Sequence, residues 1–356
     1  MNKNMVLYIV MIELKAGPDD NGRRLDRILR KALPDHSLSL IHRLLRQKKV
    51  KVNGKPYSQN DHIISGDVIQ IKVPDELPRQ LISGHPPRLS DQPQLLRASA
   101  MQPLSDTGCL SQCHFPGAPT PLLPASLILW QGSGIIVFNK PPGLTSHGEN
   151  SLDTLVKAWF AGQQAGGSGR SLSFKPGPLH RLDKPTSGAI AFSESLEGAQ
   201  LFSRLLRERK LAKTYLALVE GVIAEKTVWH DDLSRDSSRK KTLVKTGLGA
   251  KGAVTAVRGL ASNGAYTLAE LRIETGRTHQ IRAQAAAHGY PLAGDAKYGG
   301  SPIPAIAQFP HFFLHAWKME IPAGEAPLNF PFPLIAPLPE AFLLLISQYF
   351  TKNPVL

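Results

Sequence analysis

Residues 180–188 read His-Arg-Leu-Asp-Lys-Pro-Thr-Ser-Gly, and an apolar run from Ala189 to Phe192 follows them. Proline fixes one backbone dihedral and glycine permits a left-handed turn, so this stretch predicts a short rigid loop that leads into a strand. Asp183 then stands at the mouth of a sheet, where a carboxylate suits a nucleophile or a general base. The plainer interpretation is a loop aspartate that only caps a turn, and the rest of the chain argues against it.

Further motifs follow in an order that matches a known family. They are Ile136-Val137-Phe138-Asn139-Lys140-Pro141-Pro142-Gly143, Lys213-Thr214-Tyr215-Leu216-Ala217-Leu218-Val219-Glu220-Gly221, Thr275-Gly276-Arg277-Thr278-His279-Gln280-Ile281-Arg282, Gly294-Asp295-Ala296-Lys297-Tyr298-Gly299 and Leu314-His315-Ala316. Together with residues 180–188 they resemble the RluA-type pseudouridine synthases over residues 128–345. The resemblance implies an enzyme that isomerises uridine in RNA.

The resemblance also implies roles for individual residues. Asp183 is expected to carry the reaction, as nucleophile at the anomeric carbon of the sugar or as base at the adjacent carbon, and the sequence leaves both open. Arg282 is the expected ion-pair partner that keeps this carboxylate charged. Tyr215 is expected to stack on the target uracil, and Arg181 to insert into the RNA stack during base flipping. A core tyrosine and a structural salt bridge are the alternatives for these last two.

Other positions in the motifs have less specific expectations. Arg277 and His279 are expected to contact phosphate or to order their loop, and His180 to shape the loop before Asp183. Lys140 precedes a Pro-Pro-Gly turn and is expected to lie in the cleft wall, where it could touch phosphate. Asp295 is the nearest second acid and is expected to be structural.

Size and charge indicate two domains and a polyanionic partner. The chain has 356 residues and a formal charge of +14. Residues 1–74 hold 14 Lys/Arg against 7 Asp/Glu. Within them, apolar spacing predicts helices over 23–33 and 39–47, strands at 6–10, 50–52 and 68–73, and a tight turn at Asn53-Gly54.

This small α/β module resembles the ribosomal-protein-S-four-like RNA-binding domain. The residues expected to face phosphate are Arg43, Arg46, Lys48, Lys49 and Lys51. Such a cluster gives salt-sensitive affinity with little reading of bases. A solvated helix face is the alternative, but the cluster continues past the helix onto the hairpin.

Residues 75–126 are expected to be a flexible linker. Nine prolines fall between residues 78 and 124, and no apolar periodicity is sustained. The linker contains the two cysteines, Cys109 and Cys113, so a disulfide framework is excluded and a reducing compartment is indicated. Together with His114 they lack the spacing of a four-ligand zinc site, so no metal is expected.

Residues 127–356 are expected to form the catalytic domain, of the α+β class. Helices are expected from about residue 152 and over 195–209, and strands over 213–219, 254–258 and 266–273. The resemblance implies the pseudouridine synthase fold, in which flanking helices cover a mixed, mainly antiparallel central sheet with a cleft across it.

The remaining patterns exclude several classes of protein. No phosphate-binding Walker loop, strand-linked Gly-x-Gly-x-x-Gly or His/Cys metal set occurs, so no cofactor is expected. No run reaches the length of a membrane span, and residues 5–12 are too short for a signal peptide. The protein is therefore expected to be soluble and cytoplasmic, with no membrane partner, and a monomer by default.

The substrate and the competing functions follow from the resemblance. Large-subunit ribosomal RNA is the implied substrate, with ribosome-assembly intermediates as partners, and a transfer RNA substrate stays open. A catalytically inactive RNA-binding assembly factor would have the same fold, but Asp183, Tyr215 and Arg282 are all present. A glycoside-cleaving enzyme would need a second carboxylate in the motifs. Replacement of Asp183 by Asn separates an enzyme from a binding protein.

Overall fold

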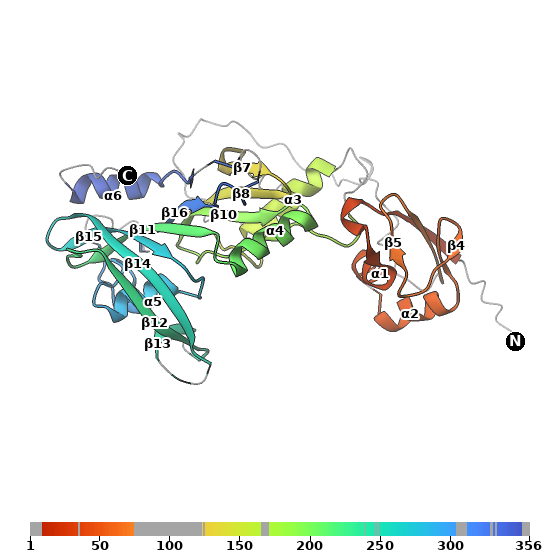
Figure 1. Ribbon diagram of the computed structural model, residues 1–356, viewed down its shortest axis with the longest axis horizontal. Coiled ribbons are helices and arrows are strands. Elements are labelled where there is room, and N and C mark those ends of the chain that lie inside the picture. Colours follow the sequence, from red (N-terminus) through yellow and green to blue (C-terminus); the bar gives the residue numbers. More distant parts are fainter. Residues whose placement is uncertain are drawn as a thin grey trace, which may run out of the picture. The chain divides into compact units, whose positions relative to one another are not determined.

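The computed structural model describes residues 9–34, 36–74, 123, 125–164, 171–238, 240–245, 247, 249–303, 312–327, 330–331 and 333–350. These residues separate into two compact units (Figure 1). Unit 1 holds the described residues up to Pro74 together with residues 171–173, and unit 2 holds the others. The three residues Cys109, Cys113 and His114, and most of the expected linker, lie outside the described residues.

Unit 1 contains a small antiparallel sheet and two helices within the described residues. In chain order its elements are β1 (Ile9–Lys15), the 3-10 turn η1 (Pro18–Asp20), β2 (Arg23–Arg24), α1 (Leu25–Ala32), α2 (Leu38–Arg46), β3 (Val50–Val52), β4 (Lys55–Pro56), β5 (His62–Ile63) and β6 (Val68–Pro74). The sheet order is β1-β6-β3-β4, and β2 pairs with β5. Helix α1 begins after Arg24, because Arg23 and Arg24 are extended and pair with β5.

The helices of unit 1 form because their apolar residues recur on one face. That face packs on the sheet through Leu25, Ile28, Leu29, Ile41, Leu44, Val50, Val52, Ile69 and Ile71. The strand expected at 6–10 starts, among the described residues, at Ile9 and continues to Lys15. It is longer than expected because Ile12 and Leu14 continue the inward alternation toward this core.

Asp20 joins residues 171–173 to unit 1. Its carboxylate is fully buried and accepts five hydrogen bonds of 2.6–3.1 Å, from the backbone N–H groups of Gly17, Leu172 and Ser173 and the hydroxyls of Ser171 and Ser173. Burial alone would raise the pKa of Asp20, but these hydrogen bonds outweigh it and hold the pKa below the ordinary value. Leu172 packs on the apolar core. A distant segment of the chain is therefore part of the fold of unit 1.

Unit 2 alternates strands with helices. Its elements are η4 (Ala125–Leu127), β7 (Ile128–Gly132), β8 (Ile135–Lys140), α3 (Leu152–Gln164), β9 (Gly177–Pro178), β10 (Ser187–Ser193), α4 (Leu196–Arg207), β11 (Ala212–Glu220), β12 (Thr227–Asp236), β13 (Lys241–Val244), β14 (Lys251–Ser262), β15 (Tyr266–Ile273), α5 (Gln280–Ala287), η5 (Ala296–Tyr298), β16 (Leu314–Glu320), β17 (Leu334–Ile335) and α6 (Glu340–Tyr349). Leu123 is buried in its main core, so unit 2 begins before residue 127.

One large sheet organises unit 2 and confirms the expected fold class. The strand order is β13-β12-β14-β15-β11-β16-β10-β8-β7, with β17 on β16 and β9 on β10. Among the pairs of described strands, only β10 with β16 is parallel. Helix α5 lies beside the half formed by β12–β15, and α3 and α4 lie beside β8 and β10 (Figure 1). The sheet is therefore mixed and mainly antiparallel.

The outer half of this sheet is larger than the sequence predicted. Strand β14 extends on both sides of the expected 254–258, and β12 and β13 were not expected. In β12 the apolar residues that point inward are Trp229 and Leu233, and Asp231 between them lies on the same face, where it accepts a hydrogen bond from Gln284 Nε2 at 2.7 Å. Two apolar residues among so many polar ones do not produce a recognisable strand pattern.

The central strands are covered on both faces. Ile136, Phe138, Ile190 and Phe192 belong to the cluster that contains Leu152 and Val156 of α3. The residues between them, Ile135, Val137, Ala189 and Ala191, pack with Phe202 and Leu205 of α4. Continuous apolar runs are typical of strands buried on both sides. This rigid centre supports the loops at the strand ends, including the Asp183 loop.

We expect Asp20→Ala to destabilise unit 1 by about 2–4 kcal/mol, because five donors lose a buried charged acceptor. Amide hydrogen exchange of β6, measured in the whole chain, reports this loss. The pKa of Asp20 is lowered in the folded state, so its contribution is present above about pH 4 and disappears as the pH falls through the lowered value.

The matched control is Glu13→Ala, which removes the same charge from an exposed position on β1. Exchange of β6 should then stay near that of the wild-type protein. Equal exchange in the two variants would mean that residues 171–173 do not contribute to the fold of unit 1.

Candidate active site

The backbone of the Asp183 loop is fixed by hydrogen bonds on both sides of the carboxylate. The Ser146 hydroxyl donates to the C=O of Leu182 at 2.8 Å and accepts from the Leu182 N–H at 3.0 Å. The Thr186 N–H donates to the C=O of Asp183 at 3.0 Å and closes the turn. Leu182 is buried, but the side chain of Asp183 is 16% exposed. The carboxylate is therefore held in place and still accessible.

The last residue of the stretch 180–188 has to be glycine for steric reasons. Gly188 has φ +105°, and a Cβ atom there would overlap the backbone of Ala316 on β16. Beside it, Ser187 Oγ lies 2.8 Å from Nδ1 of His315, and burial lowers the pKa of this histidine to about 4. These contacts fix the start of β10 against β16, directly after the Asp183 loop.

Lys140 holds the other side of the loop, and the expectation of a phosphate contact for it is wrong. The side chain is fully buried, and Nζ donates to the carbonyls of Pro141, Leu144 and Lys184 at 3.0, 2.8 and 3.2 Å. All three N–H bonds are thus used within the protein. Burial lowers the pKa of Lys140 to about 7, although the charge of Asp183 opposes this.

His180 is also turned inward. Its Nε2 accepts the Ala191 N–H at 3.0 Å, and its ring stacks on Phe202. Burial lowers the pKa of His180 to about 3, and the charge of Lys213 acts in the same direction. The histidine is therefore neutral and joins the loop to β10.

Arg282 joins two carboxylates from different parts of the chain. Its Nε and Nη2 donate to Oδ2 and Oδ1 of Asp295 at 2.7 and 2.8 Å, and Nη1 donates to Oδ2 of Asp183 at 3.1 Å. The guanidinium lies over the rings of Phe312 and Tyr298, at 4.3 and 4.8 Å. Burial lowers the pKa of Arg282, but its hydrogen bonds and the two negative charges outweigh burial, so the pKa is raised.

His279 approaches the same carboxylate from the loop before α5. Its Nε2 lies 3.7 Å from Oδ2 of Asp183, and its Nδ1 lies 2.8 Å from the hydroxyl of Tyr298. The residue has φ +52°. Burial lowers its pKa, which the charge of Asp183 opposes and that of Arg282 supports. His279 is thus part of the site around Asp183.

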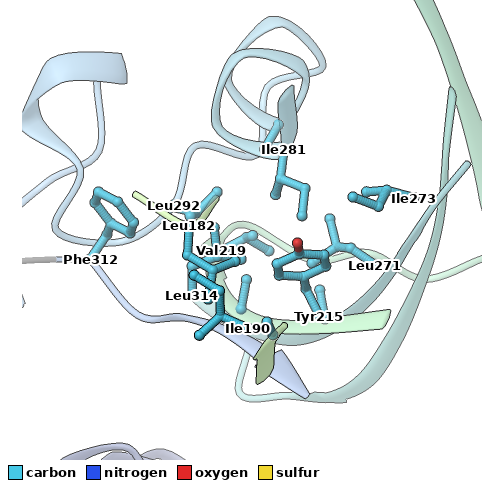
Figure 2. Packing of buried hydrophobic residues seen from close by; sticks show 14 of the residues in the cluster. Leu182, Ile190, Tyr215, Val219, Leu271, Ile273, Ile281, Leu292, Phe312 and Leu314 are labelled. Atoms are coloured by element: carbon cyan, nitrogen blue, oxygen red, sulfur yellow. The ribbon is translucent and has the colours of Figure 1, made fainter. Parts of the chain in front are cut away.

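Tyr215 supplies the aromatic ring of the site. It lies on β11 among Leu271, Ile273 and Ile281 and is largely buried (Figure 2). Burial raises the pKa of its hydroxyl, and the charge of Asp183 adds to this, so the tyrosine is neutral and close to the carboxylate. The structure therefore brings Asp183, Arg282, Tyr215 and His279 together.

The other cationic residues expected to bind RNA lie at the surface. Arg181 and Arg277 are exposed, and Arg277 Nε donates to the C=O of Gly252 at 3.3 Å. In unit 1 the cluster expected to face phosphate is exposed or partly exposed: Arg43, Arg46, Lys48, Lys49 and Lys51. None of these five side chains has an ion-pair partner in the described part of the chain.

Asp295 was expected to be structural, although its contact with Arg282 was not foreseen, and Ser146 is a site residue that sequence reasoning missed. Asp295 is 2% exposed and binds Arg282 with both oxygens. A Gly-Asp pair inside a matched motif was the available signal, since a buried acid requires a cation. For Ser146 no signal existed, because nothing in a lone serine predicts a hydrogen bond to Leu182.

Within the described residues, no group of three or more His, Cys, Asp or Glu side chains could hold a metal ion. In the same part of the chain, no helix is both long and apolar enough to cross a membrane.

We expect Arg282→Met to destabilise unit 2 by about 3–5 kcal/mol, because Asp295 would be left as a buried carboxylate without a partner. All four tryptophans belong to unit 2, so chemical denaturation followed by tryptophan fluorescence measures the change. Arg258→Met is the matched control: its partner Glu270 is on the surface, and the arginine side chain is 55% exposed. That substitution should cost at most about 1 kcal/mol. Equal losses would contradict the assigned role of Arg282.

Comparison with known proteins gives a family for each unit. The family described as RNA pseudouridylate synthase matches residues 134–287, which include the Asp183 loop and Arg282. The S4 domain family matches residues 23–69. A human structure, RNA pseudouridylate synthase domain containing 4, has a TM-score of 0.51 at 24% identity and covers 62% of this chain and 92% of its own, which supports the fold.

Similar proteins extend over most of the chain. The ribosomal large subunit pseudouridine synthase D of Nitrosomonas europaea is 30% identical over 319 residues, which are 87% of this chain and 80% of that protein. The protein of the same name from Neisseria meningitidis serogroup A is 28% identical over 357 residues, 97% of this chain and 82% of its own length. The chain therefore belongs to the RluA-type family of RNA pseudouridine synthases and carries an N-terminal S4 domain.

Proposed function

We propose that the protein converts specific uridines of large-subunit ribosomal RNA to pseudouridine, and that Asp183 carries the reaction. The observation that supports this best is the accessible Asp183 carboxylate, held at 3.1 Å by Arg282 beside the ring of Tyr215. The reaction breaks the bond between the uracil and the sugar, turns the uracil and joins it through carbon 5. No atom is gained or lost.

Asp183 can act in two ways on this site geometry. As a nucleophile its carboxylate attacks the anomeric carbon and the uracil leaves with the bonding electrons. As a base it removes a proton from the adjacent sugar carbon, and the uracil leaves by elimination. Both paths need a negatively charged oxygen, and Nη1 of Arg282 donates to Oδ2 of Asp183 at 3.1 Å. Carbon 5 of the uracil then bonds the anomeric carbon, as the carboxylate leaves in the first path and as the proton returns to the adjacent sugar carbon in the second. Carbon 5 finally loses its proton and N1 gains one, so the atoms balance.

Tyr215 and Arg181 supply the steps around the chemistry. A uridine in folded RNA has to leave its stack before Asp183 can reach its sugar. The ring of Tyr215 is largely buried beside Asp183, so stacking on the flipped uracil, worth about 1–3 kcal/mol, requires the base to enter the site as far as this ring. Arg181 is exposed and lies two residues before Asp183, so its side chain is free to fill the vacated space.

The choice of ribosomal RNA rests on similarity and charge. Relatives that cover most of the chain are named for the large ribosomal subunit. The S4 domain presents its cationic cluster, Arg43 to Lys51, at the surface. A ribosomal substrate also implies a cytoplasmic enzyme, with assembly intermediates of the large subunit as partners. Transfer RNA is the second candidate substrate, and an inactive assembly factor is the candidate without catalysis.

We expect Asp183→Asn to abolish pseudouridine formation, since the amide keeps the shape of the side chain but lacks its charge. Pseudouridine mapping at single-nucleotide resolution, in RNA from a deletion strain complemented with each variant, measures this. Asp232→Asn, at an exposed position on β12, is the control and should restore every site. If Asp183→Asn removed pseudouridine from transfer RNA sites alone, the proposal of a ribosomal RNA substrate would be wrong. Full modification by Asp183→Asn would overturn the catalytic role.

We expect the unit 1 cluster to contribute affinity and no chemistry. Replacing Arg43, Arg46 and Lys51 by Gln should weaken binding to ribosomal RNA and flatten the dependence of log K on log salt by about 0.7–0.9 per lost phosphate contact. The single-turnover rate at saturating protein should not change. The matched control replaces Arg27, Arg30 and Lys31, which are exposed on α1. The same salt slope in both triple variants would show that α2 and β3 do not face RNA.

A further inference from the structure

Lys213 is a cation at the active site for which the mechanism above has no use. It is the second residue of β11. In the antiparallel pairing of β11 with β15, Lys213 lies opposite Ile273 and Tyr215 lies opposite Leu271. Residues two apart on a strand share a face, so Lys213 and Tyr215 lie on the same side of the sheet, roughly 6.5 Å apart along β11. Its Nζ lies 3.5 Å from the position that a Cβ atom would take on Gly276.

The ammonium group of Lys213 has no partner for its charge. Its side chain takes part in no ion pair or hydrogen bond with the described residues. Burial lowers the pKa of Lys213 to about 8, and no carboxylate opposes this. Lys140, which is fully buried, differs because its Nζ donates to three carbonyls and lies in the field of Asp183.

A desolvated cation without a counter-charge is costly, and an anion supplied by a ligand would remove that cost. Lys213 lies close to two segments. Its charge lowers the pKa of His180 in one of them, and its Nζ lies beside Gly276 in the other. The next residue of each segment is an exposed arginine, Arg181 and Arg277. The side chain is itself partly exposed. The spot is therefore cationic, reachable and open to one negatively charged group.

We propose that Lys213 binds a backbone phosphate next to the uridine that the enzyme modifies. The inference rests on the proposed function, because it takes RNA as the ligand and Tyr215 as the stacking face for the flipped base. A nucleotide places its phosphate several ångströms from its base, which matches the separation of Lys213 from Tyr215 along β11. The contact would hold the flipped nucleotide by both ends, the uracil on Tyr215 and the phosphate on Lys213.

The proposal makes RNA affinity depend on pH. Phosphate binds the protonated form of Lys213, so the affinity of the wild-type protein should fall as the pH rises through about 8. The charged or titratable groups on the adjoining segments include His180, Arg181, Asp183, Arg272, Glu274, Arg277, His279, Lys318 and Glu320. His180, with a pKa of about 3, is neutral throughout this range. The substitution Lys213→Arg keeps the positive charge and removes only its titration in this pH range.

The test compares Lys213→Met and Lys213→Arg with the wild-type protein. The control is Lys226→Met, which removes a charge from an exposed position of unit 2. The probe is an unmodified transcript of large-subunit ribosomal RNA, and the dissociation constant is measured between pH 7 and 9 and from about 50 to about 200 mM KCl. Tryptophan fluorescence of unit 2 checks that each variant is folded.

We expect Lys213→Met to raise the dissociation constant about tenfold and to flatten the salt slope by about 0.7–0.9, with Lys226→Met unchanged. The wild-type dissociation constant should rise up to about tenfold from pH 7 to 9, while that of Lys213→Arg should not. An unchanged affinity and salt slope for Lys213→Met would overturn the proposal. So would the same pH dependence in the wild-type and Lys213→Arg proteins.

The proposed function is checked separately in the same samples. Pseudouridine formed by the wild-type protein in the ribosomal transcript supports the substrate. If none forms there and a transfer RNA transcript is modified instead, the ribosomal substrate is wrong, and the four proteins are compared on the transfer RNA. The difference between Lys213→Met and Lys226→Met then still decides whether Lys213 binds phosphate.

Discussion

The arrangement of the active site depends on one guanidinium that serves two carboxylates. Arg282 binds Asp295 with two nitrogens and reaches Asp183 with the third. A planar fork of donors can make both contacts at once, which a lysine cannot. Because Asp295 is buried and Asp183 is accessible, one carboxylate fixes the arginine and the other stays open to the surroundings of the site. Helix α5, η5 and the Asp183 loop are thereby joined at one point.

Much of the fold and of the candidate site could be predicted from the sequence, because the residues that determine them form local patterns. The helices of unit 1 follow from apolar residues at helical spacing, and β8 and β10 from apolar runs. The motifs predicted that Asp183, Tyr215 and Arg282 meet, and the structure brings them together. The family and the fold class expected from these motifs are confirmed by the similar proteins and by the sheet.

The parts that could not be predicted depend on contacts between distant residues. Lys140 was expected in the cleft wall, within possible reach of phosphate, but three carbonyls from two loops bind its ammonium group, and no local pattern reveals that. Asp20 receives its hydrogen bonds from residues 171–173, which local periodicity cannot connect with it. In β12 the inward apolar residues Trp229 and Leu233 are separated by polar ones, so the strand shows no continuous apolar alternation. In each case the deciding partner is absent from the neighbouring sequence.

Lys140 and Lys213 show how the environment separates residues of one type. Lys140 is satisfied by the protein, and Lys213 is left for a ligand. Along β11, Lys213 and Tyr215 then form a platform for one nucleotide, and Asp183 faces it from the loop. In the proposed function the S4 domain adds affinity through exposed cations that need no fixed geometry. The proposed contacts therefore fix the position of the RNA closely at Asp183 and only approximately in unit 1.

The most direct test of the account is the single-turnover rate of Asp295→Asn on an RNA that the wild-type protein modifies. The side chain of Asp295 contacts only Arg282 among the described hydrogen-bond and ion-pair partners, so it has no route to the substrate except through that arginine. The account predicts a rate at least about tenfold lower with unchanged RNA affinity, because a misplaced Arg282 no longer holds Asp183. A folded Asp295→Asn protein with the wild-type rate would contradict it.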